Sequence, residues 1–228
     1  MKTRFLSLLG ASLGLSLALA APAHAELTLL NATAWQAQYA HAGYDPLGAL
    51  PADTVLDGPL QRQAGRHSYQ VDSTQHALYG FADGQGGMQL TTEAVLDRLE
   101  LNSFSAGVTG LAGWISALDL FGESRERVLL QLSLTDVLGA SFQRVLELSF
   151  EPLFVGLHST VALQSISLSV LDHGSLGHIS YVSPSLGGLW LSDGQDGPGQ
   201  NVPEPGALAL LAIGLLALGL QRRNTPAA

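Results

Sequence analysis

The stretch RVLLQLSLTD, residues 127–136, alternates apolar and polar side chains along most of its length. Successive side chains of a β-strand point to opposite faces, so Leu130, Leu132 and Leu134 share one face and the polar residues between them share the other. One apolar face and one polar face are typical of an antiparallel strand with a single side in the core. The stretch therefore predicts a half-buried strand.

Two later stretches repeat the pattern and extend the prediction to a sheet. RVLELSF, residues 144–150, and SISLSVL, residues 165–171, alternate in the same way. Their predicted core-facing residues are Leu146, Leu148 and Phe150 in the first and Ile166, Leu168 and Val170 in the second. Val161 and Leu163 have the opposite parity to the second set, which predicts a β-bulge or bend before Ile166.

Glycines punctuate these stretches, at positions 122, 139, 156, 174 and 187–188. Because glycine adopts turn conformations readily, the spacing predicts short strands joined by turns, which is typical of sandwiches and jelly rolls. The predicted fold is all-β: an antiparallel β-sandwich or jelly-roll-like domain with one short N-terminal helix. Two further helices are predicted to flank this domain, one in a signal peptide and one, transmembrane, at the C-terminal side.

The short helix is predicted in NATAWQAQYAHAGYD, residues 31–45. Thr33 is the expected N-cap, with Gln36 completing a capping box, and Gly43 is expected at the C-terminal end. Trp35 and Tyr39 are four residues apart and are expected on one helix face.

The region between this helix and the alternating stretches contains several prolines and glycines. Residues 45–90 are therefore expected to be mostly irregular, with strands at HSYQV (67–71) and HALYGF (76–81). TTEAVLDRLELNSF, residues 91–104, fits either a helix or a strand. We favour a strand from about Leu96, because Val95, Leu99 and Leu101 then share one face.

The first 25 residues have the organisation of a secretory signal peptide. Lys2 and Arg4 precede an apolar segment, and Ala23 and Ala25 occupy the small-residue positions of a cleavage site. Cleavage after Ala25 would leave Glu26 as the first residue. The alternative is an uncleaved N-terminal anchor.

The last part of the chain combines a proline boundary, an apolar run and a basic pair. Residues 207–220 contain only Ala, Leu, Ile and Gly, so a helix there has no polar face. The run would span about 21 Å, against about 30 Å for a bilayer core. Arg222 and Arg223 follow it directly, and basic residues beside a span favour the cytoplasmic side. The basic residues at both ends of the chain therefore place the body between them outside the cytoplasm.

This order of features resembles the PEP-CTERM sorting signal of Gram-negative bacteria. The resemblance rests on Pro203, Glu204 and Pro205, followed by the apolar run and the arginines. It implies that an exosortase-type membrane peptidase cuts near the tripeptide, after transient anchoring in the inner membrane. It also implies delivery of the body to the cell surface or the exopolysaccharide matrix. The rhythm of Phe104 to Asp193 is similar to the bodies of many such proteins, which implies a β-sandwich and no particular activity.

The predicted organisation is a signal peptide (1–25), a β-sandwich domain (26–192), a flexible linker (193–202) and a sorting tail (203–228). Between residues 26 and 200 there are six arginines and eighteen Asp and Glu, a net charge of −12, and no cysteine. Nucleic acid and anionic lipid are thus excluded as expected partners, because phosphate recognition needs clustered basic residues. Disulfides and thiolate metal sites are excluded as well.

Sequence motifs for catalysis are not found. The cluster LDHGSLGHISY, residues 171–181, contains Asp172, His173, Ser175 and His178 but no nucleophile elbow, so we interpret it as a solvated loop. Glu93, Asp97 and Glu100 would line one helical face, as in any acidic domain. Asp193 and Asp196 lie among glycines and are weak candidates for calcium ligands. No cofactor is expected.

The sequence therefore favours a non-enzymatic exported protein of the cell surface or matrix. A carbohydrate-binding module is the alternative, with Trp114, Tyr181 and Trp190 as candidate sugar-contacting aromatics. Each lies in an apolar run, which favours burial, so their exposure separates the two hypotheses. A secreted hydrolase is a third hypothesis, and it requires a pocket that joins carboxylates or histidines from distant strands.

Overall fold

The computed structural model describes residues 26–82, 87–95, 97–172 and 182–194. They all belong to the first of two compact units of the chain, Met1–Asp196; the second is Gly197–Ala228. No helix within the described residues is long and apolar enough to cross a membrane. The predicted signal peptide, the apolar run 207–220 and most of the predicted linker lie outside the described residues.

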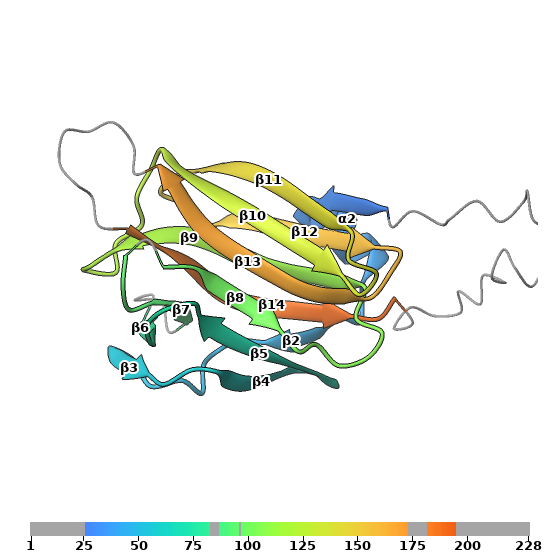
Figure 1. Ribbon diagram of the computed structural model, residues 1–228, viewed down its shortest axis with the longest axis horizontal. Helices are drawn as coiled ribbons and strands as arrows, with labels where there is room; N and C mark the ends of the chain where they lie inside the picture. Colours follow the sequence, from blue (N-terminus) through green and yellow to red (C-terminus); the bar gives the residue numbers. More distant parts are fainter. Residues whose placement is uncertain (1–25, 83–86, 96, 173–181, 195–228) are drawn as a thin grey trace, which may run out of the picture. The chain divides into compact units, whose positions relative to one another are not determined.

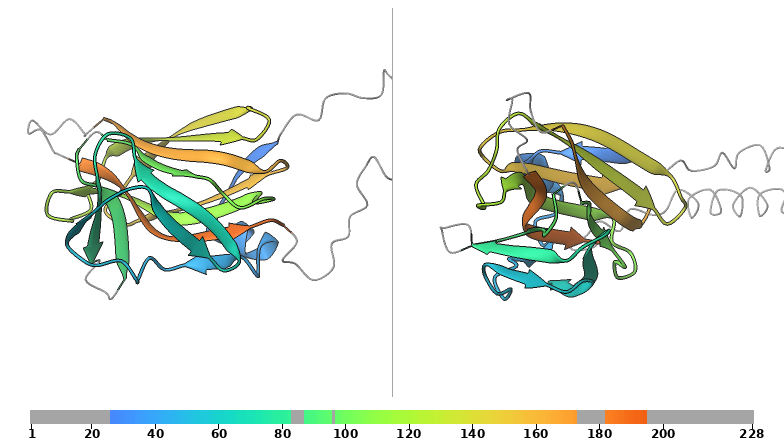
Figure 2. Two further views of the ribbon diagram at one scale, coloured as in Figure 1. Left: turned by 60° about the horizontal axis from the view of Figure 1, so that its bottom comes forward. Right: turned by 60° about the vertical axis from the view of Figure 1, so that its left-hand side comes forward.

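The described body consists of two antiparallel sheets stacked as two layers (Figures 1 and 2). Sheet A has eight strands, in the order β1-β12-β9-β14-β7-β6-β3, and β2 pairs with β14 beside β7. Sheet B has six strands, in the order β11-β10-β13-β8-β5-β4. The strands of sheet A are β1 (Leu27–Leu30), β2 (Gly43–Asp45), β3 (Thr54–Leu56), β6 (Leu78–Ala82), β7 (Met88–Thr92), β9 (Gly110–Asp119), β12 (Leu153–Ser159) and β14 (Val182–Ser192). Those of sheet B are β4 (Leu60–Ala64), β5 (His67–Ser73), β8 (Leu99–Asn102), β10 (Val128–Asp136), β11 (Ser141–Leu148) and β13 (Leu163–Asp172).

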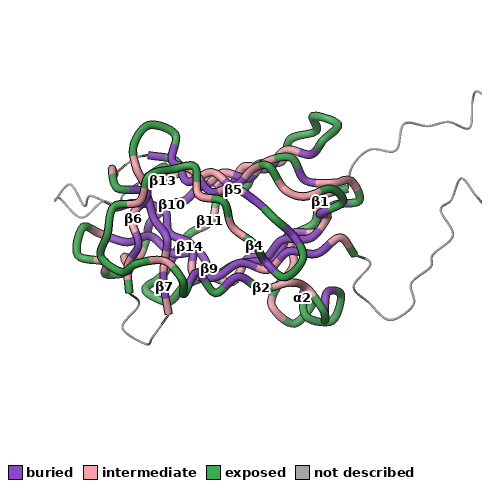
Figure 3. The backbone as a smooth tube through the Cα atoms, turned by 90° about the horizontal axis from the view of Figure 1, so that it is seen from below, coloured by how far each residue is buried: buried purple, intermediate pink, exposed green. Residues whose placement is uncertain are grey.

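The core lies between the two sheets, and the alternation of residues 127–136 predicts its sheet B side correctly. Leu130, Leu132 and Leu134 on β10 are at most 1% exposed. They pack in one cluster with apolar side chains of β9, β13 and β14; β9 and β14 are buried along most of their length, as Figure 3 shows. Burial of each such side chain contributes about 1.5–3 kcal/mol. Among the residues that the structure describes, the buried members of this cluster lie between Leu47 and Leu191.

The predicted irregularity before Ile166 is a β-bulge. Thr135 on β10 faces Ser165 on β13, whereas the next residue, Asp136, faces Leu163, which leaves Gln164 as the extra residue. Ile166 and Leu168 beyond the bulge are buried, as the alternation predicts.

Several expectations about the other turns and strands are wrong. Phe150 lies beyond the end of β11 and is 58% exposed, because the strand ends at Leu148. Gly156 lies inside β12, where a Cβ atom would meet the Leu30 carbonyl oxygen at 2.9 Å. Gly187 and Gly188 lie within β14, at a bulge opposite β9. Gly122 and Gly139 do occupy turns, with φ of 78° and 83°; Gly174 lies outside the described residues.

The helix α2 spans Ala32–Gln38, and its N-cap is Asn31, not Thr33. The Asn31 backbone is extended and its Oδ1 accepts a hydrogen bond from the backbone N–H of Ala34, so Asn31 satisfies a free donor of the first turn, three residues after the cap. Gly43 is also reassigned, because it begins β2. The expected pairing of Trp35 with Tyr39 is confirmed: both are buried and their ring centroids lie 4.2 Å apart.

Residues 45–90 are more regular than expected. The strands at 67–71 and 76–81 are present as β5 and β6, but β3, β4 and most of β7 also lie in this region. These strands have three to seven residues and pair largely with one another, β4 with β5, β3 with β6 and β6 with β7. They are short and lie among prolines and glycines, so local composition does not reveal them. The strand expected from about Leu96 is β8; Leu99 and Leu101 are buried as predicted, whereas Val95 lies in a turn before it and Leu96 lies outside the described residues.

Candidate functional site

The outward face of sheet A carries aromatic side chains, because β9 and β14 direct leucines inward and tryptophans outward. On β9, Leu111 and Ile115 join the core, so Trp114 between them by parity faces outward. On β14, Leu189 and Leu191 are fully buried, and Trp190 between them is only partly buried. The expectation that both tryptophans are buried is wrong for Trp114, which is 41% exposed. Tyr181, the third candidate, lies outside the described residues.

Four rings from four neighbouring strands form what we call the aromatic strip. Tyr44 on β2 stacks on Trp190 with ring centroids 4.3 Å apart, since the two residues are register partners. Phe154 on β12 links Trp190, at 6.0 Å, to Trp114, at 5.3 Å. Tyr44 is 47% exposed. The sequence analysis missed Tyr44 and Phe154, although their places opposite Trp190 and Trp114 in the register make them part of the same surface.

Helix α2 covers one end of this face and leaves part of the aromatic strip uncovered. Trp35 and Tyr39 pack on Ala112 of β9, with Phe154 and Trp190 partly buried against them. Gly110 and Gly156 leave room for the helix rings; a Cβ on Gly110 would meet the Tyr39 ring at 2.7 Å. The exposed rings of Trp114 and Tyr44 lie on the part of the face that the helix leaves open.

A groove of about 370 Å³ opens beside the strip, and we call it the Trp114 groove. Tyr44, Trp114, Gln89 and the glycine pair of β14 line it, together with Ser116. Gly188 has a φ of 75°, and a Cβ there would lie 2.8 Å from the Tyr44 hydroxyl oxygen. The glycine pair therefore lets the groove wall approach Tyr44. None of the described residues that line the groove is Asp, Glu, Lys, Arg or His.

The floor of the groove is polar and its hydrogen bonds are specific. The Ser116 and Ser185 hydroxyls each donate to Oε1 of Gln89, both at 2.9 Å. The amide oxygen of Gln89 is therefore used in hydrogen bonds within the protein, and its NH₂ group is a donor for a ligand. The groove thus offers aromatic faces beside an amide donor and hydroxyl groups, without a formal charge.

A buried ion pair holds β2, the strand that carries Tyr44. Asp45 is 3% exposed and accepts hydrogen bonds from Nε and Nη2 of Arg62, at 2.9 and 2.6 Å. The Tyr69 hydroxyl donates to the same carboxylate at 2.8 Å, and so does the backbone N–H of Leu47 at 2.9 Å. Burial raises the pKa of Tyr69, and the Asp45 charge raises it further. Burial lowers the pKa of Arg62, but its hydrogen bond to Asp45 and the carboxylate charge outweigh that effect and raise it. β2 is therefore fixed to β4 and β5 of the other sheet.

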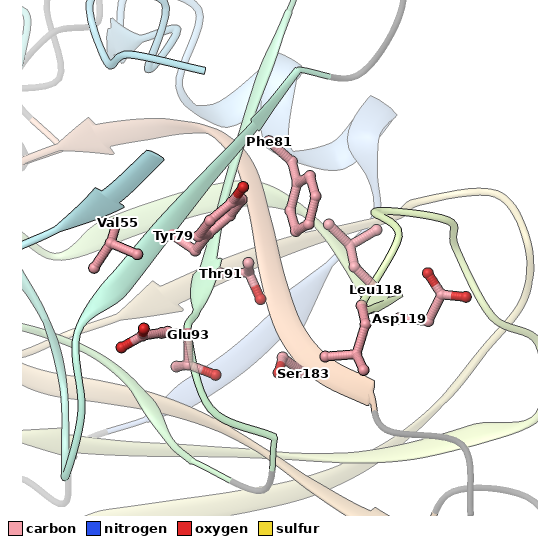
Figure 4. A pocket seen from close by; sticks show the side chains of 10 residues that line it. Val55, Tyr79, Phe81, Thr91, Glu93, Leu118, Asp119 and Ser183 are labelled. Carbon is pink, nitrogen blue, oxygen red and sulfur yellow. The ribbon is translucent and has the colours of Figure 1, made fainter. Parts of the chain in front are cut away.

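A second, smaller cleft of about 200 Å³ lies on the same face, and we call it the Tyr79 cleft. Figure 4 shows Tyr79 and Glu93 on one side of it and Asp119 on the other, with Thr91 and Ser183 between them. The Tyr79 and Phe81 rings are 4.6 Å apart.

The Tyr79 cleft contains the carboxylates of Glu93 and Asp119, which come from distant segments of the chain. The hydrolase hypothesis requires a pocket of this kind. Asp119, however, is occupied within its own turn. Its carboxylate accepts from the backbone N–H groups of Phe121 and Glu123, at 2.9 and 3.0 Å, and from the Arg125 guanidinium. Burial would raise the pKa of Asp119, but these hydrogen bonds and the Arg125 charge lower it. Asp119 is thus held ionised and is poorly suited to act as a general acid.

The other acidic candidates do not form a shared site. Asp97 is buried and accepts from the Ser73 and Thr74 hydroxyls and from the backbone N–H groups of His76 and Arg98, at 2.9 and 2.8 Å. Burial would raise its pKa, but these hydrogen bonds hold it well below the usual range. Glu93 is exposed after β7, and Glu100 lies on β8. The expected helical face is absent because this segment forms a turn and a strand.

The remaining predicted residues are mostly outside the described part of the chain. Asp193 is described and binds Arg66 through both oxygens at 2.7 Å, whereas Asp196 lies outside. No group of three His, Asp or Glu in the described ranges could hold a metal ion. Glu26 is exposed, and its backbone N–H donates to the Thr160 hydroxyl at 3.0 Å. The other predicted residues outside the description are Ala23, Ala25, His173, Ser175, His178, Pro203, Glu204, Pro205, Arg222 and Arg223.

Comparisons with known proteins identify the C-terminal segment. A family 29 carbohydrate-binding module is among similar solved structures, with 12% identity, a TM-score of 0.34, and coverage of 67% of this chain and 97% of that one. Another is the CBM51-2 and INT domains of ZmpB from Clostridium perfringens, in complex with GlcNAc. It has 10% identity, a TM-score of 0.32, and coverage of 65% of this chain and 31% of that one. No curated protein matches the sequence. A family model described as the PEP-CTERM protein-sorting motif matches residues 201–223. The chain therefore carries the PEP-CTERM sorting signal that the order of its C-terminal residues predicts.

Proposed function

We propose that this chain is an exported, non-enzymatic protein of the cell surface or exopolysaccharide matrix, and that its β-sandwich binds carbohydrate in the Trp114 groove. The sorting motif implies export, surface sorting and processing by an exosortase. In the proposed route, signal peptidase cuts after Ala25, and the apolar run 207–220 anchors the chain transiently in the inner membrane. Exosortase then cuts near Glu204.

The exposure of Trp114 is the observation that carries the binding proposal. Water contact with an aromatic face costs free energy, about 25 cal/mol per Å² of apolar surface, so two neighbouring exposed rings in one groove carry a cost that a bound ligand would remove. Trp114 is nevertheless 41% exposed, and Tyr44 in the same groove is 47% exposed. Exposed apolar surface with polar groups around it is typical of a binding groove.

The chemistry of the groove suits a sugar better than a peptide or an anion. A pyranose ring presents an apolar face of C–H groups and a rim of hydroxyls. The rings of Trp114 and Tyr44 offer flat apolar surfaces to the C–H face of the sugar. The Gln89 amide and Ser116 offer hydrogen bonds to its hydroxyl groups. These contacts support carbohydrate over the purely structural alternative, which requires no exposed ring.

A binding experiment on residues 26–200 tests the proposal, because this range contains both sheets and the described core. A glycan array and pull-down on insoluble polysaccharides should detect binding. Trp114→Ala should weaken it at least tenfold, since central aromatic anchors contribute about 2 kcal/mol or more. Val145→Ala is the control, because Val145 is 51% exposed on β11 of the other sheet. The proposal fails if the domain binds no glycan, or if Trp114→Ala binds as tightly as the unmodified domain.

A further inference from the structure

We infer that the Tyr79 cleft is a second binding site for the same ligand, and that the ligand is therefore an extended, uncharged polysaccharide chain. This inference rests on the proposed carbohydrate binding. It adds the length of the ligand, its direction across sheet A and its charge.

The two clefts lie on one continuous face, as the strand register shows. On β9, Trp114 lines the Trp114 groove and Leu118, four residues later, lines the Tyr79 cleft. Residues an even number apart on a strand share a face, so both belong to the outward face. On β14, Gly187 and Ser183 have the same relation, and each is the register partner of the corresponding β9 position. At about 3.4 Å per residue, the two clefts are about 14 Å apart along the strands.

Between the clefts lies the partly buried amide of Gln89, which is held by buried hydroxyl groups. Ser116 and Ser185 are partners in the register between β9 and β14, and both donate to Gln89 on β7. Thr91, two residues after Gln89, donates its hydroxyl to the Pro184 carbonyl at 2.9 Å. Aromatic surface thus lies at both ends, and the Gln89 NH₂ group between them is a hydrogen-bond donor for a ligand. That arrangement matches a row of linked sugar rings better than a single sugar.

The Tyr79 cleft is held open by its own local structure. Val55, on the edge strand β3, is 47% exposed beside Tyr79. On the far side, Gly122 lies against Phe81, where an added Cβ would meet the ring at 2.7 Å. The Asp119 hydrogen bonds fix the turn that contains Gly122. The cleft is therefore formed before a ligand arrives, which lowers the ordering cost of binding.

The charges around the two clefts decide against an anionic polysaccharide. The only Asp, Glu, Lys, Arg or His residues among the described residues that line either cleft are Glu93 and Asp119, both acidic. Arg125, beside the Tyr79 cleft, is bound to Asp119 and Glu123. A uronate chain would meet negative charge without a cationic partner, whereas a neutral chain avoids this repulsion.

The test measures affinity against chain length and against two matched substitutions. Disaccharides and hexasaccharides of cellulose, mannan, xylan and galactan are titrated into the domain by calorimetry, with polygalacturonate as the anionic probe. The hexasaccharide of the bound series should bind at least tenfold more tightly than the disaccharide. Tyr79→Ala and Val55→Asp should each remove this gain and leave disaccharide binding unchanged. Val145→Asp is the control, because it makes the same change at a similarly exposed position on an edge strand of sheet B.

Each outcome supports or overturns the inference. Equal affinity for the two lengths, or a length gain that survives both Tyr79→Ala and Val55→Asp, overturns it and leaves the Trp114 groove as a single-sugar site. Tighter binding of polygalacturonate than of every neutral probe overturns it too. If no probe binds at all, the proposed carbohydrate binding itself is wrong. Val55→Asp replaces an exposed side chain, so it keeps the test valid if Tyr79→Ala fails to fold.

Discussion

Substitution of Asp45 by Ala should be among the most destabilising single changes in this domain that remove no apolar side chain. The carboxylate is buried and accepts four hydrogen bonds, two of them from Arg62. Its removal leaves the guanidinium, which is only 15% exposed, without its counter-ion, and leaves the Tyr69 hydroxyl and the Leu47 N–H without their acceptor.

The expected loss of unfolding free energy is about 3–5 kcal/mol, the usual cost of removing one partner of a buried pair. Domains are stable by about 5–15 kcal/mol, so a large part of the stability disappears. At about 2–4 °C per kcal/mol for a domain of this size, the melting temperature should fall by about 6–20 °C.

Urea and thermal unfolding followed by far-UV circular dichroism measure the effect. The double variant Asp45→Ala/Arg62→Met should lose less than the sum of the two single variants, because the unpaired charge is then removed as well. Arg98→Ala is the control; the Arg98 pair with Glu100 is exposed, so its loss should cost about 0–1 kcal/mol. A loss below about 1 kcal/mol for Asp45→Ala would refute the argument that this pair holds β2 in place.

Four further predictions concern pH, backbone, processing and metal. The pKa of Asp97 is depressed in the fold, so its contribution to stability should be present above the ordinary Asp value of 3.8 and lost as pH falls below it; urea midpoints across this range, with and without Asp97→Asn, measure the loss. Gly188→Ala should destabilise the domain by about 1–2 kcal/mol and weaken glycan binding, because position 188 has a positive φ and the new methyl group meets Tyr44. Urea unfolding and calorimetric titration measure the two effects, and a variant that is unchanged in both contradicts the prediction. Glu204→Ala should leave an uncut form in the inner membrane, detected by mass spectrometry of host fractions; surface protein that keeps Arg222 and Arg223 contradicts the sorting mechanism. The melting temperature of residues 26–200 should not change on addition of EDTA, and a large drop would show a calcium site near Asp193.

The alternating stretches were predictable because their information is local. A period of two predicts the buried face formed by Leu130, Leu132 and Leu134. The change of parity before Ile166 predicts the β-bulge. The sorting motif is equally local, since its order of proline, apolar and basic residues is read along the chain and matches a family model without any tertiary structure.

The same parity rule could have placed Trp190 outward, because Leu189 and Leu191 on either side face the core. The apolar composition of the segment concealed this and favoured burial. The N-cap was misplaced for a related reason: Asn31 and Thr33 are both good caps, and only the backbone geometry of the first turn distinguishes them.

The groove itself depends on contacts that the sequence does not encode locally. By itself the sequence determined the sorting signal, the strand faces of the core and the absence of common catalytic motifs. Only the tertiary structure brought Tyr44 onto Trp190, Phe154 onto Trp114, and Asp45 onto Arg62 and Tyr69. These pairs join different strands, and the two aromatic pairs join strands that are far apart in the chain. Which strands become neighbours is decided by the joint burial of two whole sheets rather than by the residues of any one stretch.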